Sequence, residues 1–202
     1  MPIYKVPVSV YDILWKKEIK RDIDKARKSF LWFGSSGLIH KGLDLCLEVF
    51  KELPEYNLYI CGPKEEDFFE LYSNELKLEN INYLGFMEVS SFEFRRLVEL
   101  CLFVIYPSCS EGTSGALLTC MSVGLIPVAT KETGVHLNNG FSISNNELNI
   151  VETIGAISKL DINTLEKLSK DNAKYIECNH TIHDFRSKIN KNIIKILGAK
   201  NG

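Results

Sequence analysis

Short apolar segments alternate with amphipathic segments along most of this chain. The apolar segments have the length of β-strands, are rich in Val, Ile, Tyr and Phe, and show no regular polar alternation, which is typical of strands buried on both faces. We predict strands at 30–33, 57–60, 81–86, 102–106 and 125–130, with a sixth short strand around 140–144.

The segments between these strands have helical spacing. In 41–53, Leu43, Cys46, Leu47 and Phe50 fall at i, i+3, i+4 and i+7. Further helices are predicted at 65–78, from Ser90 with Glu93 as its capping-box partner, and at 112–123, 148–160, 162–176 and 182–197. Strand–helix alternation predicts βαβ units with right-handed crossovers. The expected fold is therefore α/β: a Rossmann-like parallel sheet of about six strands, helices on both faces, and C-terminal helices.

The two ends of the chain differ from this pattern. Residues 1–29 contain Pro2, Pro7 and a dense run of charges, so we interpret them as a linker or connecting segment, followed by a domain over 30–202. The last helix carries an apolar stripe that we expect to pack across the sheet domain. Its members are Ile182, Phe185, Ile189, Ile193 and Ile196.

Composition narrows the classes of function. With 202 residues, 45% of them hydrophobic and 25% charged, the chain is ordinary globular protein. A formal net charge of −2 gives no basic excess for nucleic acid. No apolar run approaches the roughly 20 residues of a membrane span, and Met1 to Val10 lacks the apolar region of a signal peptide, so we expect a cytoplasmic location. The six cysteines form no CxxC and are expected to be mostly buried, reduced thiols.

Open parallel sheets bind ligands at the carboxyl ends of their strands. Two loops that follow predicted strands have residues suited to ligand binding. The first, 34–42, has glycines that let main-chain N–H groups approach a ligand, and Lys41 at the helix start could neutralise a phosphate. Its spacing matches neither GxGxxG nor a Walker loop, so it indicates neither NAD nor ATP. The alternative is a plain turn with a solvated lysine.

The second loop, 106–115, carries Glu111, the only carboxylate between Leu100 and Lys131. Glu111 stands at a helix entrance among glycines and hydroxyls, where exposed N–H groups suit a diphosphate or sugar hydroxyls. The alternative is a first-turn carboxylate that complements the helix dipole.

Several of these segments, in this order, carry a family resemblance. They are Phe33-Gly34-Ser35 with His40-Lys41-Gly42, then 58–63, 81–85, Tyr106-Pro107-Ser108 with Ser110-Glu111-Gly112, 121–128 and Thr133-Gly134. Together they resemble the C-terminal domain of group 1 retaining glycosyltransferases, which have the GT-B fold. The resemblance covers roughly 28–197.

The resemblance implies a nucleotide-sugar site. Lys41 would contact phosphate. Glu111 matches the first Glu of the family's E-x7-E motif, and the role implied for that Glu is to bind the hydroxyls of the donor sugar. Thr113, Ser114 and Gly115 would offer N–H groups to sugar and diphosphate, and Cys61, Gly62 and Phe86 would lie near the base. The predicted catalytic residues are thus Glu111 and Lys41. The predicted donor-binding residues are Gly34, Ser35, Ser36, Gly37, Cys61, Gly62, Phe86, Gly112, Thr113, Ser114, Gly115, Leu118 and Thr119.

Two positions depart from the family pattern. Thr119 stands where the second Glu of the motif would bind ribose, and a hydroxyl is a weaker partner there than a charged acceptor. Ser35 stands where the family usually has Arg, which removes one cation from the diphosphate site.

Other signals are weaker. Asp22-Ile23-Asp24 is formally a DxD, but it lies in a charged run and is best interpreted as a solvated helix face. Cys178, His180 and His183 lack a fourth ligand at zinc spacing, so we expect no metal and no cofactor beyond the nucleotide-sugar substrate. No Ser-His-Asp arrangement or close carboxylate pair suggests hydrolysis.

The favoured function is the donor-binding domain of a glycosyltransferase that moves a hexose to an acceptor hydroxyl with retention. We expect the acceptor site in an N-terminal domain absent from this chain, inactivity of the chain alone, and possible peripheral membrane association of the full enzyme. One alternative is a non-catalytic binding or interaction domain derived from such an enzyme. A less favoured alternative is another GT-B enzyme, such as a sugar-nucleotide epimerase.

Overall fold

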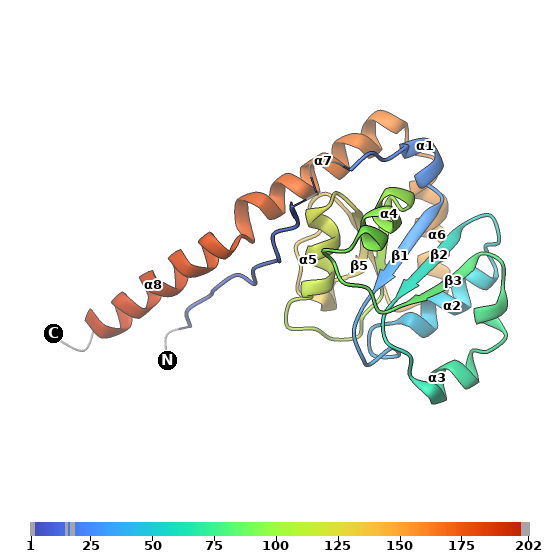
Figure 1. Ribbon diagram of the computed structural model, residues 1–202, viewed down its shortest axis with the longest axis horizontal. Coiled ribbons are helices and arrows are strands. Elements are labelled where there is room, and N and C mark those ends of the chain that lie inside the picture. Colours follow the sequence, from blue (N-terminus) through green and yellow to red (C-terminus); the bar gives the residue numbers. More distant parts are fainter. Residues whose placement is uncertain (1–2, 15, 17–18, 199–202) are drawn as a thin grey trace.

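The computed structural model describes residues 3–14, 16 and 19–198 (Figure 1). Its strands are β1 (Ser29–Phe33), β2 (Asn57–Cys61), β3 (Ile81–Gly85), β4 (Phe103–Tyr106), β5 (Ile126–Thr130) and β6 (Phe141–Ile143). Its α-helices are α1 (Ile23–Ala26), α2 (Leu43–Lys51), α3 (Glu66–Leu71), α4 (Phe92–Leu100), α5 (Gly115–Ser122), α6 (Glu147–Ile157), α7 (Ile162–Asn179) and α8 (Ile182–Gly198). Short 3-10 turns lie at η2 (Glu75–Lys77) and η3 (Lys131–Thr133).

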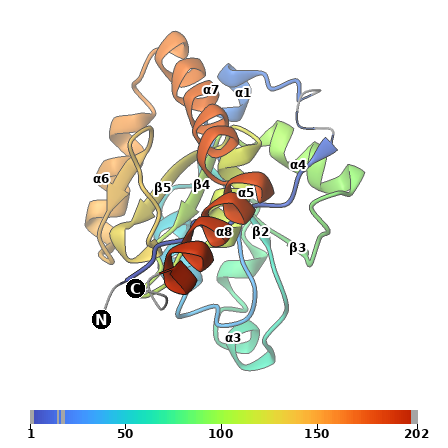
Figure 2. The same ribbon diagram turned by 90° about the vertical axis from the view of Figure 1, so that its left-hand side faces the viewer.

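The six strands form one parallel sheet in the order β3-β2-β1-β4-β5-β6. β4 and β5 are buried along their whole length, as uninterrupted apolar strands require. Helices cover both faces, α2 with α6 on one and α5 with α7 on the other (Figures 1 and 2). This arrangement confirms the predicted Rossmann-like α/β fold.

Local chemistry corrects some predicted bounds. The segment 65–78 is the short α3 followed by η2, and not one helix. Ser91, and not Ser90, caps α4, because the Ser91 side chain accepts from the Phe94 N–H at 3.1 Å. α5 begins only at Gly115, because Ser114 is its N-cap and accepts from the Leu117 N–H at 3.3 Å.

The expectation that the last helix packs across the sheet is wrong. α8 has no buried residue and projects away from the domain beside the N-terminal segment (Figure 1). The sheet face on that side is already covered by α5 and α7, so the stripe of α8 finds no surface there. Its side chains of Ile182, Ile193 and Ile196 are 48%, 47% and 41% exposed.

The segment before β1 is bound to the domain more closely than its charged pattern indicates. Ile13 and Ala26 belong to the hydrophobic core. The buried Arg21 guanidinium donates to three main-chain carbonyls and one hydroxyl, and desolvation lowers the pKa of Arg21 to about 10. The acceptors are the carbonyls of Val98, Val123 and Gly124 and the hydroxyl of Ser169. Arg21 therefore ties this segment to the ends of α4 and α5 and to α7.

None of the helices in the described ranges is long and apolar enough to cross a membrane.

Candidate functional site

The two predicted loops meet at the point where the strand order reverses. β1 and β4 are neighbours, and their following helices lie on opposite faces, which is the position where open α/β sheets bind ligands. The His40 carbonyl accepts from the Cys109 N–H at 2.9 Å and from Ser108 Oγ at 3.2 Å. The His40 ring also contacts the Ser110 carbonyl. The loop after β1 and the loop after β4 are therefore one connected unit.

Gly42 makes this close approach possible. Its φ of +74° is in the left-handed region, and a Cβ there would lie 2.2 Å from the Pro107 carbonyl oxygen. Only glycine fits both the conformation and the space. The residue that opens α2 is thus fixed against the start of the second loop.

Lys41 and Glu111 meet across this junction. Lys41 Nζ lies 3.0 Å from Glu111 Oε1, and the two side chains are 14% and 19% exposed. Tyr106 Oη donates to the same Glu111 oxygen at 3.3 Å. The two residues predicted to be catalytic, 70 positions apart in sequence, thus form a partly buried ion pair at the carboxyl edge of the sheet.

Glycines extend the main-chain hydrogen bonding between neighbouring strands past the ends of β1 and β2. The Gly34 N–H donates to the Cys61 carbonyl at 3.0 Å, and the Gly62 N–H donates to the Gly85 carbonyl at 3.0 Å. A Cβ on Gly62 would lie 2.9 Å from the Gly34 carbonyl oxygen, so the two main-chain segments can pass this closely only with glycine at position 62. Gly34, Cys61 and Gly62 therefore lie in neighbouring positions at the ends of β1 and β2, with the Cys61 thiol buried.

The remaining predicted donor-binding residues are placed unequally. Ser35, Ser36 and Phe86 are exposed, Phe86 to 76%, after the ends of β1 and β3. Gly37 follows the two serines, and Gly112, Thr113, Ser114 and Gly115 form the approach to α5. Leu118 differs from the others, because its side chain is fully buried in the core. Thr119 Oγ1 donates to the Gly115 carbonyl at 2.8 Å, so its proton is used within the helix.

Sequence reasoning missed two contributors. Glu65, at the start of α3, accepts from the Gly37 N–H at 2.6 Å, which places a carboxylate on the loop expected to take phosphate. Glu65 lies just after the second predicted strand, but nothing in its local sequence indicates a contact with the loop after β1. Tyr106, noted only as part of a motif, reaches Glu111 from the end of β4.

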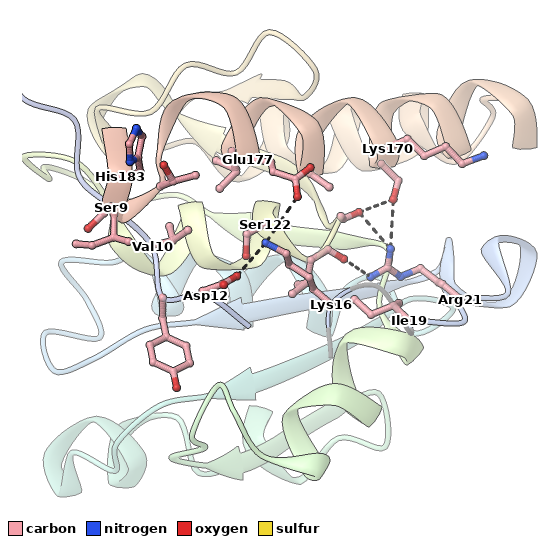
Figure 3. Close-up of a pocket in the computed structure, with 18 of the residues that line it drawn as sticks. Ser9, Val10, Asp12, Lys16, Ile19, Arg21, Ser122, Lys170, Glu177 and His183 are labelled. Atoms are coloured by element: carbon pink, nitrogen blue, oxygen red, sulfur yellow. Dashed lines mark hydrogen bonds and ion pairs between the residues drawn. The ribbon is translucent and has the colours of Figure 1, made fainter. Parts of the chain in front are cut away.

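A large cavity lined by described residues lies elsewhere. About 1140 Å³ in volume, it lies between the N-terminal segment, α5, α7 and the start of α8 (Figure 3). Its charges are paired with one another: Lys16 Nζ lies 3.1 Å from Asp12 Oδ1 and 4.0 Å from Glu177 Oε1. The Arg21 guanidinium is saturated by carbonyl and hydroxyl oxygens. This cavity shares no residue with the strand-end site.

Metal-binding geometry is not found over the described ranges, where no group of three or more His, Cys, Asp or Glu side chains is placed to hold an ion. Asp22, from the formal DxD, instead caps α1 by accepting from the Lys25 N–H at 3.3 Å. His180 Nδ1 lies 2.8 Å from the Val8 carbonyl and contacts the N-terminal segment.

A parallel sheet in this order, with glycine-bearing loops and a Lys–Glu pair at its switch point, defines a Rossmann-like domain suited to phosphorylated ligands. The chain belongs to the glycosyl transferases group 1 family, whose model matches residues 16–175. No curated protein matches it significantly.

Solved structures share the fold. HepE of Anabaena, crystallised with UDP and glucose, superposes with a TM-score of 0.76 at 16% identity, covering 95% of this chain and 57% of HepE. A glycosyltransferase of Rickettsia africae gives 0.71 at 17% identity, covering 90% and 50%. Sucrose-phosphate synthase of Thermosynechococcus elongatus gives 0.75 at 12% identity, covering 96% and 52%. The chain thus spans about half the length of these proteins.

Proposed function

We propose that this chain is the donor-binding part of a retaining hexosyltransferase, which holds a nucleoside diphosphate sugar while the hexose passes to an acceptor hydroxyl. The partly buried Lys41–Glu111 pair at the switch point carries this proposal. It combines a cation for the diphosphate with a carboxylate for sugar hydroxyls, in a family whose members transfer sugars. HepE, which shares the fold, was crystallised with UDP-glucose.

The roles follow from the chemistry of each group. Lys41 would pair with the diphosphate and stabilise the charge that develops as the sugar leaves. Glu111 would accept hydrogen bonds from sugar hydroxyls, which fixes the anomeric carbon for attack. The N–H groups of Thr113 and Gly115, at the entrance of α5, would support the negative charge.

We further propose that the acceptor site lies in a second, N-terminal domain that contacts the arm formed by residues 3–14 and α8. This arm exposes large apolar side chains on both of its segments. Ile3 and Leu14 are each 87% exposed, and Ile194 and Leu197 are 70% and 58% exposed. Apolar surface of this kind favours burial against a partner. The expected result is that the 202-residue chain alone binds donor but transfers no sugar, so robust turnover by it would contradict this part.

Donor binding is tested by thermal shift and calorimetry with UDP-glucose, GDP-mannose and ADP-glucose at millimolar concentration. We expect one of them to stabilise the chain, since a ligand at 100 times its Kd adds about 2.7 kcal/mol to the unfolding free energy. The variant Glu111→Gln, which keeps the shape of the side chain, should lower the affinity for that sugar nucleotide.

The second candidate function is a non-catalytic binding domain derived from the same family. Thr119 and Ser35, which stand where the family has charged residues, favour it. The two candidates separate in the same experiment, because stabilisation by none of the three sugar nucleotides would support the binding domain and contradict the donor site.

A further inference from the structure

Two stacked aromatic side chains hydrogen-bond to the two residues of the Lys41–Glu111 pair. The Tyr106 and Trp32 rings have centroids 6.2 Å apart and planes 21° from parallel, and both side chains are buried. Trp32 Nε1 donates to the Lys41 carbonyl at 3.2 Å, and Tyr106 Oη donates to Glu111 Oε1 at 3.3 Å. One aromatic pair, formed by neighbouring strands β1 and β4, therefore touches both charged residues.

The two oxygens of Glu111 are used differently. Oε1 accepts from both Lys41 Nζ and Tyr106 Oη, and no hydrogen bond from the described residues falls on Oε2. The main chain is fixed as well, because the Glu111 N–H donates to the Glu132 carbonyl at 2.8 Å. Lys41 has a flexible side chain, whereas the Tyr106 ring is buried. Of the two donors to Oε1, the tyrosine hydroxyl is thus the one carried by a buried ring.

The hydroxyl remains a donor at working pH. Burial, followed by the nearby Glu111 charge, raises the pKa of Tyr106 well above its ordinary value. The protonated phenol therefore faces the carboxylate as a donor, at a distance of 3.3 Å that is longer than the usual range of about 2.5–3.0 Å of an O–H···O hydrogen bond.

We propose that Tyr106 is a positioning residue, whose hydroxyl holds Glu111 Oε1 so that Oε2 is directed to the donor sugar. This inference rests on the proposed donor-binding function, because it assigns the sugar contact to one oxygen of Glu111. It implies that Tyr106 contributes to recognition of the sugar and little to recognition of the nucleoside diphosphate.

A purely structural role of the Tyr106 hydroxyl would give a different result in the Tyr106→Phe variant. If the tyrosine hydroxyl only needs a partner in a buried position, Tyr106→Phe changes stability and leaves ligand preference unaltered. If the hydroxyl positions Glu111, Tyr106→Phe weakens sugar-nucleotide binding selectively. The ratio of the two affinities, for UDP-glucose and for UDP, separates these cases independently of folding.

The experiment measures both affinities by calorimetry for the wild-type chain and for Tyr106→Phe. GDP-mannose with GDP, or ADP-glucose with ADP, replaces this pair if that sugar nucleotide is the one bound. We expect UDP-glucose affinity to fall about three- to ten-fold, the size expected for loss of a typical hydrogen bond, and UDP affinity to stay within about two-fold.

Two further variants control for the loss of a hydroxyl. Tyr83→Phe removes the donor to the Gly62 carbonyl, 3.2 Å away at the end of β2, and should leave the affinity ratio unaltered. In a Glu111→Gln background, Tyr106→Phe should change the ratio less than it does in the wild type, because the two residues act together.

An unaltered ratio in Tyr106→Phe, with the wild type binding UDP-glucose, overturns this inference and leaves the proposed function in place. A wild-type chain that binds none of the three sugar nucleotides overturns the proposed function and this inference together.

Discussion

The two loops of the candidate site differ in how firmly the domain holds them. In the loop after β4, the Ser108 carbonyl accepts from Thr130 Oγ1 at 2.7 Å, and the N–H groups of Glu111 and Ser114 bond to the carbonyls of Glu132 and Thr133. In the loop after β1, the serines at 35 and 36 are exposed, and the main chain at Gly37 is held from outside the loop by the Glu65 side chain.

This difference matches the chemistry proposed for each loop. A sugar has several hydroxyls in fixed directions, so its carboxylate partner, Glu111, has to be oriented precisely. A diphosphate carries charge spread over many oxygens, so the exposed serines at the start of the loop after β1 need less exact orientation, while Lys41 at the fixed end of that loop supplies the charge. The firm loop serves orientation and the looser loop serves charge.

The first variant breaks the junction between the loops. Gly42→Ala places a Cβ 2.2 Å from the Pro107 carbonyl oxygen at a φ of +74°, so both space and conformation oppose it. We expect the unfolding free energy, from urea titration, to fall by about 2–4 kcal/mol, as for other strained substitutions in packed regions. The control is Gly155→Ala in α6, where a Cβ meets nothing within 4 Å and helix propensity favours alanine. Equal stability of the two variants would contradict the packed junction.

The second variant removes the charge that crosses the junction. Lys41→Met keeps the length and apolar stem of the side chain but loses the ammonium group. We expect affinity for the nucleoside diphosphate to fall about 10- to 30-fold, the size expected for a charge-assisted contact. Lys131→Met is the matched control, because its side chain is 87% exposed just after β5 and should leave affinity within two-fold. Equal losses in both variants would indicate a general charge effect instead of a contact.

Much of the fold was predictable because the central strands β1, β4 and β5 are buried along almost all of their length. Uninterrupted apolar runs such as 102–106 mark central parallel strands, and the helices between them fix the hand of each crossover. The position of the loops followed from that alternation. The meeting of Lys41 with Glu111 was anticipated only as nearness at one edge of the sheet, since sequence alone does not specify an ion pair.

The packing of α8, the burial of Leu118 and the contact of Glu65 could not be predicted, because they depend on tertiary contacts that hydrophobic periodicity does not encode. The stripe on α8 has the spacing of a packed helix, yet α5 and α7 already occupy the sheet face. Leu118 lies one turn from the loop in sequence, but its side chain points into the core. Glu65 reaches Gly37 from another loop, and neither residue type nor local spacing signals such a contact.

The third variant adds a carboxylate to the helix that follows the firm loop. Thr119→Glu restores the carboxylate that the family places at this position for ribose, one turn into α5. Because the Thr119 hydroxyl donates its proton to the Gly115 carbonyl, the present side chain is committed to the helix. We expect about two- to five-fold tighter binding of the nucleoside diphosphate, the size expected for one added hydrogen bond of ordinary strength. Thr119→Gln supplies an uncharged acceptor of similar length and should give a smaller gain. No gain in either variant would place the ribose away from α5.

The fourth variant tests the looser loop through the carboxylate that holds it. Glu65 accepts from the Gly37 N–H at 2.6 Å, so a diphosphate approaching this loop meets a negative charge of the protein itself. Glu65→Gln keeps an oxygen acceptor for that N–H and removes only the charge. We expect about two- to three-fold tighter binding of UDP at low salt, with the gain shrinking at 0.5 M NaCl, where charges are strongly screened. Glu66→Gln, one residue further on with its side chain 80% exposed and paired with Lys64, is the control and should change affinity less. Weaker binding in Glu65→Gln would mean instead that the carboxylate orders the loop for its ligand, and the contrast between a firm and a loose loop would not hold.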